Sequence, residues 1–194
     1  MAVDPQLTPE IIREVVIAAH FNLEKVRAML ADKPALLTVQ HQWGENDYED
    51  GLGAASHVGS RPIAEFLLEQ GAPMSICAAA MLGRKADVAA FIQADATQAN
   101  ARGAHSIPIL FHAALSGNTD LANLLLDAGC NEGFDDALHA AITYDHLDMV
   151  NWLLQHGATD LQVLNYEGKT PLKKAVELGH TAIADILRSR GAVE

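Results

Sequence analysis

One phrase recurs along the chain, and this repetition constrains the fold more than any other feature. In each copy, apolar side chains at helical spacing follow a turn residue and precede a glycine. The clear copies are GSRPIAEFLLEQGA (59–72), GNTDLANLLLDAGC (117–130), DHLDMVNWLLQHGA (145–158) and GHTAIADILRSRGA (179–192). A degenerate copy occupies 83–96, and a weaker one begins near Phe21. The pattern predicts a series of short amphipathic helices, each ended by a glycine in the left-handed conformation.

A second, alanine-rich phrase precedes each copy. Its versions are GLGAASHVG (51–59), ICAAAMLG (76–83), ILFHAALSG (109–117), ALHAAITYD (137–145) and TPLKKAVELG (170–179). Small side chains allow a helix to pack closely against its neighbours. Thr170-Pro171 and Thr8-Pro9 each place a hydroxyl cap before a proline suited to the first helical position, so both predict helix starts. The chain is therefore expected to form repeated pairs of helices.

The segment NYEGKTPLKKAVELGHTAIADILRSRGA (165–192) resembles the ankyrin repeat almost residue for residue. The motif is filled by Gly168, Thr170, Pro171, Leu172, Ala175, Gly179, His180, Gly191 and Ala192, with Asn165 at the usual aspartate position. Lys173 replaces the usual histidine, which His139 keeps in the preceding repeat. The resemblance extends from about Ile11 to Val193. It implies an all-α solenoid of stacked helix-turn-helix pairs with short β-hairpin or loop tips.

We expect one ankyrin-repeat domain over residues 1–194, with unevenly spaced repeats. The predicted repeats lie at about 8–36, 43–73, 74–97, 100–130, 131–160 and 161–194. The turn residue before each outer helix falls at 59, 83, 117, 145 and 179, so the steps are 24, 34, 28 and 34 residues. An ankyrin unit has about 33 residues. Because the helical phrases are intact, the two short steps predict truncated hairpins near Pro73 to Ser75 and near Asn131 to Asp135.

The charge of the chain argues against two classes of partner. Asp and Glu number 25 against 13 Lys and Arg, for a formal net charge of −12, and no Lys or Arg occurs between Gly103 and Gly168. Nucleic-acid binders carry a basic stripe, and anionic membranes attract basic segments. We therefore expect neither partner. The acidic stretch is interpreted mainly as a solvated surface, with attraction of a basic protein as the functional alternative.

The ankyrin resemblance implies a binding scaffold whose concave groove is formed by the hairpin tips and the inner helices. A rigid, extended surface of this kind loses little entropy on binding. The two positions before each turn residue should face the groove. The candidate partner contacts are His57, Val58, Met81, Leu82, Leu115, Ser116, Thr143, Tyr144 and Glu177. Met81, Leu82, Leu115 and Tyr144 form one apolar patch in this interpretation, unless the shortened hairpins fold over them and make them core.

The long segment before the second repeat contributes two weaker candidates. Trp43 and Tyr48 lie in the acidic run WGENDYED. Exposed aromatic residues often anchor interfaces. Alternatively, either ring pins the loop onto the first repeats, and for Trp43 we favour that role.

Catalytic, cofactor and metal sites are not expected. The nine histidines include no pair at i, i+4 that would suggest a metal site on one helix. His139 and His180 match structural histidines of the repeat. No nucleophile elbow or glycine-rich phosphate loop is present. Asp135 and Asp136 precede a helix and are interpreted as its cap.

The surroundings of the protein are predicted to be reducing and aqueous. Two cysteines, Cys77 and Cys130, are too few for a disulfide framework and should be reduced. The sequence contains neither a signal-peptide pattern nor an apolar run long enough to span a membrane, which favours the cytoplasm. Because the chain begins with methionine and ends just after a repeat, we expect a stand-alone array.

Three functions remain open at this point. The favoured one is a protein-binding module, an adaptor, inhibitor or regulator acting through the concave face as a monomer. Its partner would be a protein with an apolar anchor and some basic residues. A small hydrolase or metal-dependent enzyme on the same scaffold is the first alternative. A structural or self-associating protein is the second, because Ile11, Ile12, Val15 and Val16 give the first helix an apolar face.

Overall fold

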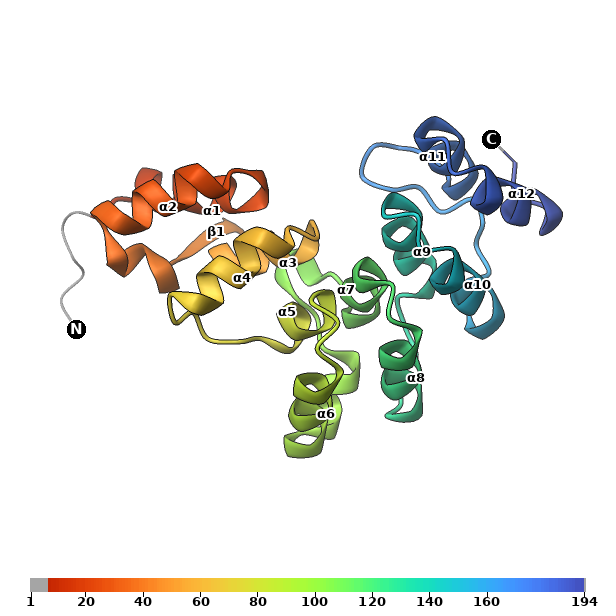
Figure 1. Ribbon diagram of the computed structural model, residues 1–194, viewed down its shortest axis with the longest axis horizontal. Helices are drawn as coiled ribbons and strands as arrows, with labels where there is room; N and C mark the ends of the chain where they lie inside the picture. Colours follow the sequence, from red (N-terminus) through yellow and green to blue (C-terminus); the bar gives the residue numbers. More distant parts are fainter. Residues whose placement is uncertain (1–6, 194) are drawn as a thin grey trace.

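The structure, a computed structural model, describes residues 7–193 and consists mainly of short helices in consecutive pairs (Figure 1). Residues 1–6 and Glu194 lie outside the described residues. The prediction of a stand-alone array rests on these two ends and therefore falls outside the described part as well. The α-helices are α1 (Pro9–Phe21), α2 (Leu23–Asp32), α3 (Gly51–His57), α4 (Arg61–Glu69), α5 (Ile76–Met81), α6 (Lys85–Ala94), α7 (Ile109–Ser116), α8 (Thr119–Asp127), α9 (Phe134–Thr143), α10 (Leu147–His156), α11 (Pro171–Leu178) and α12 (Thr181–Ser189). Three 3₁₀ turns, η1 (Pro34–Thr38), η2 (Ala96–Asn100) and η3 (Ala104–Ser106), and two strands, β1 (Gln40–Gly44) and β2 (Asp47–Asp50), complete the described part.

The helix starts follow from hydroxyl, amide and carboxylate caps. Thr170 accepts a hydrogen bond from the Lys173 amide at 3.2 Å, and Thr8 accepts from the Ile11 amide at 3.5 Å, as the two Thr-Pro pairs predicted. Asp50 caps α3 in the same way, through the Gly53 amide at 2.7 Å. Each cap satisfies an amide that the first turn of a helix leaves free.

The turn between inner and outer helices requires a left-handed residue. Glycine fills this position in most repeats, for example Gly117 with φ of 68°. Asp145 takes it in the fifth repeat with φ of 56°, a conformation that aspartate tolerates better than most residues. This explains why the repeated phrase survives there without its first glycine.

The inner helices form one row and the outer helices cover it from one side. Along the inner row, α1 packs on α3, α3 on α5, α5 on α7, α7 on α9 and α9 on α11. Alanines at the centre of α3, α5, α7 and α9 are fully buried, so these helices approach one another closely. The observed fold confirms the predicted all-α ankyrin-repeat solenoid.

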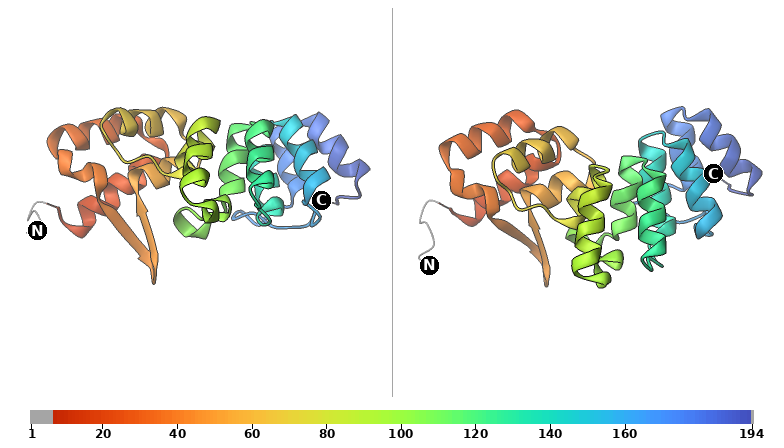
Figure 2. Two further views of the ribbon diagram at one scale, coloured as in Figure 1. Left: turned by 90° about the horizontal axis from the view of Figure 1, so that it is seen from below. Right: turned by 60° about the horizontal axis from the view of Figure 1, so that its bottom comes forward.

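Within residues 7–193, one tip alone is a full β-hairpin. β1 and β2 pair antiparallel, and Figure 2 shows this hairpin projecting from the helical layer at the N-terminal end. Residues 70–75 and 128–133 connect their helices without any strand, which confirms both predicted truncations. Asp135 does not cap α9, contrary to expectation. α9 begins at Phe134 with Gly133 as its N-cap and no side-chain cap, so Asp135 already lies inside the first turn. Its carboxylate accepts from the amides of Thr159 and Asp160 at 2.8 and 3.0 Å.

Within residues 7–193, no helix combines the length and apolar character needed to cross a membrane.

Candidate functional site

A groove of about 800 Å³ runs along the concave face. Its walls come from α1, α3, the segment 102–108, α7, α9, the loop 164–166 and α11. Aromatic and aliphatic side chains are exposed in it, among them Phe21, Leu164 and Tyr166, the last with 93% of its surface exposed. Its Arg and Lys residues are paired, since Arg102 lies 2.6 Å from Glu132 and Lys174 lies 2.9 Å from Glu167. The groove therefore offers apolar surface with largely compensated charge.

Tyr144 crosses this face between repeats that are distant in sequence. From the turn after α9, its hydroxyl donates a 2.6 Å hydrogen bond to the Val58 carbonyl at the end of α3. Its ring also lies against Gly59, where a Cβ atom would come within 2.5 Å of the Tyr144 hydroxyl. The solenoid is thus curved tightly enough for the second repeat to touch the fifth.

Two residues of the predicted partner surface are buried in the structure, so their assignment as partner contacts was wrong. Met81 is fully buried, and Leu82 is buried as well. α5 is held between α3 and α7, and Arg61 from α4 donates to the carbonyls of Met81 and Leu82 at 3.1 and 2.9 Å. These two side chains therefore belong to the core, as the alternative held, but the contacts described come from α3, α4 and α7 and not from a shortened hairpin.

Of the remaining predicted partner contacts, five line the groove and two lie outside it. The groove is lined by His57, Val58, Leu115, Thr143 and Tyr144, although Leu115 is itself mostly buried. Outside the groove lining, Ser116 donates to the Ala113 carbonyl at 2.7 Å. Glu177, also outside it, pairs with Lys169 at 2.7 Å.

The two aromatic residues of the hairpin have different environments. Trp43 is partly buried, with Arg13 over its ring at 5.6 Å and its indole N–H donating to Glu49 at 2.7 Å. This is the pinning role that we favoured. Tyr48 is half exposed and lines a second cavity instead of the groove.

A cluster of histidines surrounds Glu49 at the N-terminal end of the groove. The Glu49 residue is only 1% exposed. Its Oε1 atom lies 3.0 Å from Nδ1 of His57, 3.5 Å from Nε2 of His105 and 3.8 Å from Nε2 of His20. The elements that bring these groups together are α1, α3, β2 and η3. The three imidazoles also line the groove.

Electrostatics within the cluster oppose the effect of burial on Glu49. Burial alone would raise the pKa of the Glu49 carboxyl, but the imidazole of His57, the indole N–H of Trp43 and His20 outweigh it and hold the pKa below its usual value. For His20, burial lowers the pKa in spite of the attraction of Glu49. The cluster thus combines a buried carboxylate with an imidazole that burial favours in its neutral form.

Sequence reasoning missed this convergence because it sought histidine pairs on a single helix. Two signals were present in the sequence. His20 and His57 end successive inner helices, and Asp47 and Glu49 alternate along one strand, which places them on the same face. The third histidine, His105, has a φ of 56° in an irregular segment, and no periodic pattern points to it.

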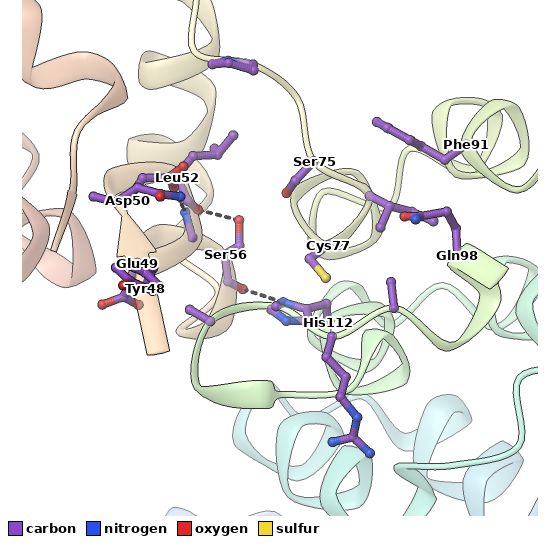
Figure 3. A pocket seen from close by; sticks show the side chains of 18 residues that line it. Tyr48, Glu49, Asp50, Leu52, Ser56, Ser75, Cys77, Phe91, Gln98 and His112 are labelled. Atoms are coloured by element: carbon purple, nitrogen blue, oxygen red, sulfur yellow. Dashed lines mark hydrogen bonds between the residues drawn. The ribbon is translucent and has the colours of Figure 1, made fainter. Parts of the chain in front are cut away.

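A second cavity of about 550 Å³ lies behind the hairpin, between β2, α3, α5 and residues 98–104. Figure 3 shows the Cys77 thiol and the His112 ring facing it, with His112 hydrogen-bonded to the Ser56 carbonyl at 3.3 Å. Burial raises the pKa of the Cys77 thiol to about 12 and lowers that of His112 to about 4. Both groups are therefore neutral, which is the opposite of the thiolate and imidazolium that an activated cysteine requires.

Comparison with known families decides the classification of this fold. The family model for ankyrin repeats (3 copies) matches residues 15–158 and again residues 110–193. The chain belongs to the ankyrin-repeat family. Stacked ankyrin repeats present extended concave binding surfaces, so this membership indicates a protein-interaction module.

Proteins of viral and animal origin are among the relatives. A putative ankyrin repeat protein of Fowlpox virus (strain NVSL) is 30% identical over 124 residues, which is 61% of this chain and 28% of the relative. The nuclear factor NF-kappa-B p105 subunit of Mus musculus is 31% identical over 99 residues, 48% of this chain and 10% of the relative. The I-Kappa-B like protein C2 of Microplitis demolitor bracovirus (isolate Webb) is 31% identical over 55 residues, 28% of this chain and 30% of the relative. The chain spans less than a third of the length of each.

Proposed function

We propose that this ankyrin-repeat chain binds a protein partner in its concave groove, as an adaptor, inhibitor or regulator and not as an enzyme. The observation that carries the proposal is the groove of about 800 Å³ with exposed Phe21, Tyr144, Leu164 and Tyr166 along it. Exposed apolar surface of this extent is typical of interaction sites. The similarity to an NF-kappa-B subunit and an I-Kappa-B like protein agrees with a protein-interaction module.

The expected partner presents an apolar anchor flanked by basic residues. The anchor would bury against Leu164 and Tyr166, which supplies affinity through loss of apolar surface from water. The net charge of −12 would accelerate encounter with a basic partner and disfavour nucleic acid and anionic membranes. The association rate should therefore fall as salt concentration rises.

The setting of this function is proposed to be the cytoplasm, with the chain acting as a monomer. Cys77 and Cys130 are both buried and free, which agrees with a reducing compartment.

One observation supports the alternative function, a metal-dependent enzyme on the ankyrin scaffold. That reading requires histidines and an acid converging beside a pocket, and His20, His57, His105 and Glu49 converge at the end of the groove.

The test compares variants matched for exposure. Leu164 and Val193 are 61% and 60% exposed, but only Leu164 lines the groove. Wild type, Leu164→Arg, Tyr166→Arg and Val193→Arg would each be immobilised and exposed to lysate of the cells that express the protein. Proteins retained by wild type and Val193→Arg but lost by both groove variants would support the proposal. Identical retention by all four, with unchanged melting curves, would refute the groove as the binding site.

A further inference from the structure

The cluster around Glu49 has the architecture of a metal site. His20, Glu49 and His57 each place one ligand atom so that the three atoms lie within 4.8 Å of one another. Nε2 of His105 lies 3.5 Å from the same Glu49 oxygen but outside this set of mutually close atoms, so its ring must move inward to act as a fourth donor. Three imidazole nitrogens and one carboxylate oxygen form a donor set that zinc commonly accepts.

The protons of two histidines are directed away from the centre of the cluster. Nδ1 of His20 lies 3.0 Å from the Val16 carbonyl, which can only accept, so Nδ1 carries the proton. Nδ1 of His105 lies 2.8 Å from the Asp47 carboxylate and is protonated for the same reason. In the neutral rings, the Nε2 lone pairs of both histidines then face Glu49. Histidine ligands of metals typically donate their second nitrogen to a carbonyl or carboxylate in this manner.

The atoms at the centre lack the partners that their burial calls for. Oε1 of Glu49 and Nδ1 of His57 are 3.0 Å apart, yet the pair is not aligned as a hydrogen bond, and both atoms are buried without a hydrogen-bond partner. The second carboxylate oxygen, Oε2, is satisfied by Trp43. A buried carboxylate oxygen that accepts no aligned hydrogen bond is costly, even with imidazole rings beside it. A cation held between Oε1 and the imidazole nitrogens would satisfy all of them at once.

The distances from Glu49 Oε1 to the surrounding nitrogens are close to those around a four-coordinate ion. Ligand bonds of about 2.0–2.1 Å in a tetrahedron place the donor atoms about 3.3 Å from one another. The distances from Glu49 Oε1 to the three nitrogens, 3.0, 3.5 and 3.8 Å, bracket that value. The ligand atoms of His20, Glu49 and His57, within 4.8 Å of one another, would draw closer to share one ion, and the His105 ring would move further to add the fourth ligand.

We propose that His20, His57 and Glu49 bind one divalent transition-metal ion, with His105 as the fourth ligand once its ring moves inward, and with Zn²⁺ as the best match to this donor set. Asp47 and the Val16 carbonyl orient the histidines and do not touch the ion. The ion would join α1, α3, β2 and η3, and it would lie at the end of the groove that three of its ligands line. The site does not depend on the groove having a protein partner.

The experiment is a titration of the tag-free, full-length chain after removal of metal with a chelator. Zn²⁺ binding is measured by isothermal titration calorimetry, and Co²⁺ is used as a second probe because a four-coordinate site shows intense visible absorption. His57→Ala and Glu49→Gln remove ligands, Asp47→Asn removes an orienting contact, and His156→Ala is the matched control. His156 lies on α10 and is not part of the cluster. Far-UV circular dichroism and metal-free melting curves establish that each variant is folded.

The expected result is one Zn²⁺ per chain, unchanged in His156→Ala and weakened by at least about 100-fold in His57→Ala and Glu49→Gln. Asp47→Asn should weaken binding by about 10- to 100-fold, the effect usual for an orienting contact. Any of three results would overturn the proposal. They are no saturable binding by wild type, binding that the folded ligand variants retain, and octahedral Co²⁺ spectra typical of adventitious surface binding.

Discussion

Lowering the pH should destabilise the protein through one buried histidine. His112 on α7 is 1% exposed, its Nδ1 donates to the Ser56 carbonyl, and its Nε2 is buried without a hydrogen-bond partner. Gly103 packs so closely that a Cβ atom there would lie 2.8 Å from Nε2. A proton added at Nε2 would place an unpaired charge in the core. Burial accordingly lowers the pKa of His112 from 6.5 to about 4.

The magnitude follows from proton linkage. The unfolded chain, with a pKa of about 6.5 for this histidine, binds the proton more readily than the folded chain, so stability falls as the pH falls from 6.5 toward 4. With 1.36 kcal/mol per pKa unit, His112 contributes a loss of about 2 kcal/mol at pH 5 and about 3 kcal/mol at pH 4, relative to pH 8. Above pH 7 the contribution of His112 to the pH dependence disappears.

The assay is urea unfolding at a series of pH values for wild type and His112→Gln. The other titrating groups, including His20 and His139, are present in both proteins, and their contributions cancel in the difference. The free energy of unfolding of wild type should fall by about 2 kcal/mol more than that of the variant between pH 8 and pH 5. Parallel curves for two proteins with equal m-values would refute the reasoning, because His112 would then titrate normally in the fold.

Three substitutions and one labelling experiment test the packing of the inner face. Tyr144→Phe removes the hydroxyl that bonds the Val58 carbonyl and should lower the free energy of unfolding by about 0.5–1.5 kcal/mol in urea titrations; no change would mean that the bridge adds nothing to stability. Gly59→Ala should cost more than about 1 kcal/mol, since φ is +75° and the new Cβ meets Tyr144, and a double-mutant cycle with Tyr144→Ala should recover part of this cost. Met81→Ala should destabilise by about 2–5 kcal/mol in chemical denaturation, and a value near zero would place Met81 at the surface after all. The Cys77 thiol, with its pKa at about 12, should resist a thiol reagent at pH 8 until the protein is unfolded, and rapid labelling of the folded chain would contradict its burial.

Much of the fold could be predicted because ankyrin helices are encoded locally. The recurring phrases indicate where helices begin and end, and Thr170 with Pro171 shows the mechanism, a side-chain cap followed by a residue suited to the first turn. The truncated tips were also accessible, since a missing residue between two intact helical phrases can only come from the connection between them.

The exposure of individual side chains was harder to predict. Met81 occupies the same repeat position as Thr143, yet one is fully buried and the other is exposed. The difference arises from the neighbours of α5 and from Arg61, which closes the end of that helix. The position of a residue within its repeat predicts which face of the solenoid it lies on. It does not predict how tightly the solenoid curves over that face, and therefore how exposed the side chain is.

The sequence by itself determined the repeated helix pairs, their boundaries, the shortened connections and the acidic charge, because each depends on residues that are close together in the chain. Only the tertiary structure decided which of the nine histidines would meet. His20, His57 and His105 come from three segments, and they surround Glu49 because the stacking of α1 on α3 and the left-handed backbone at His105 bring those segments to one point. Interactions of this kind depend on the curvature of the whole array, which no local pattern in the chain encodes.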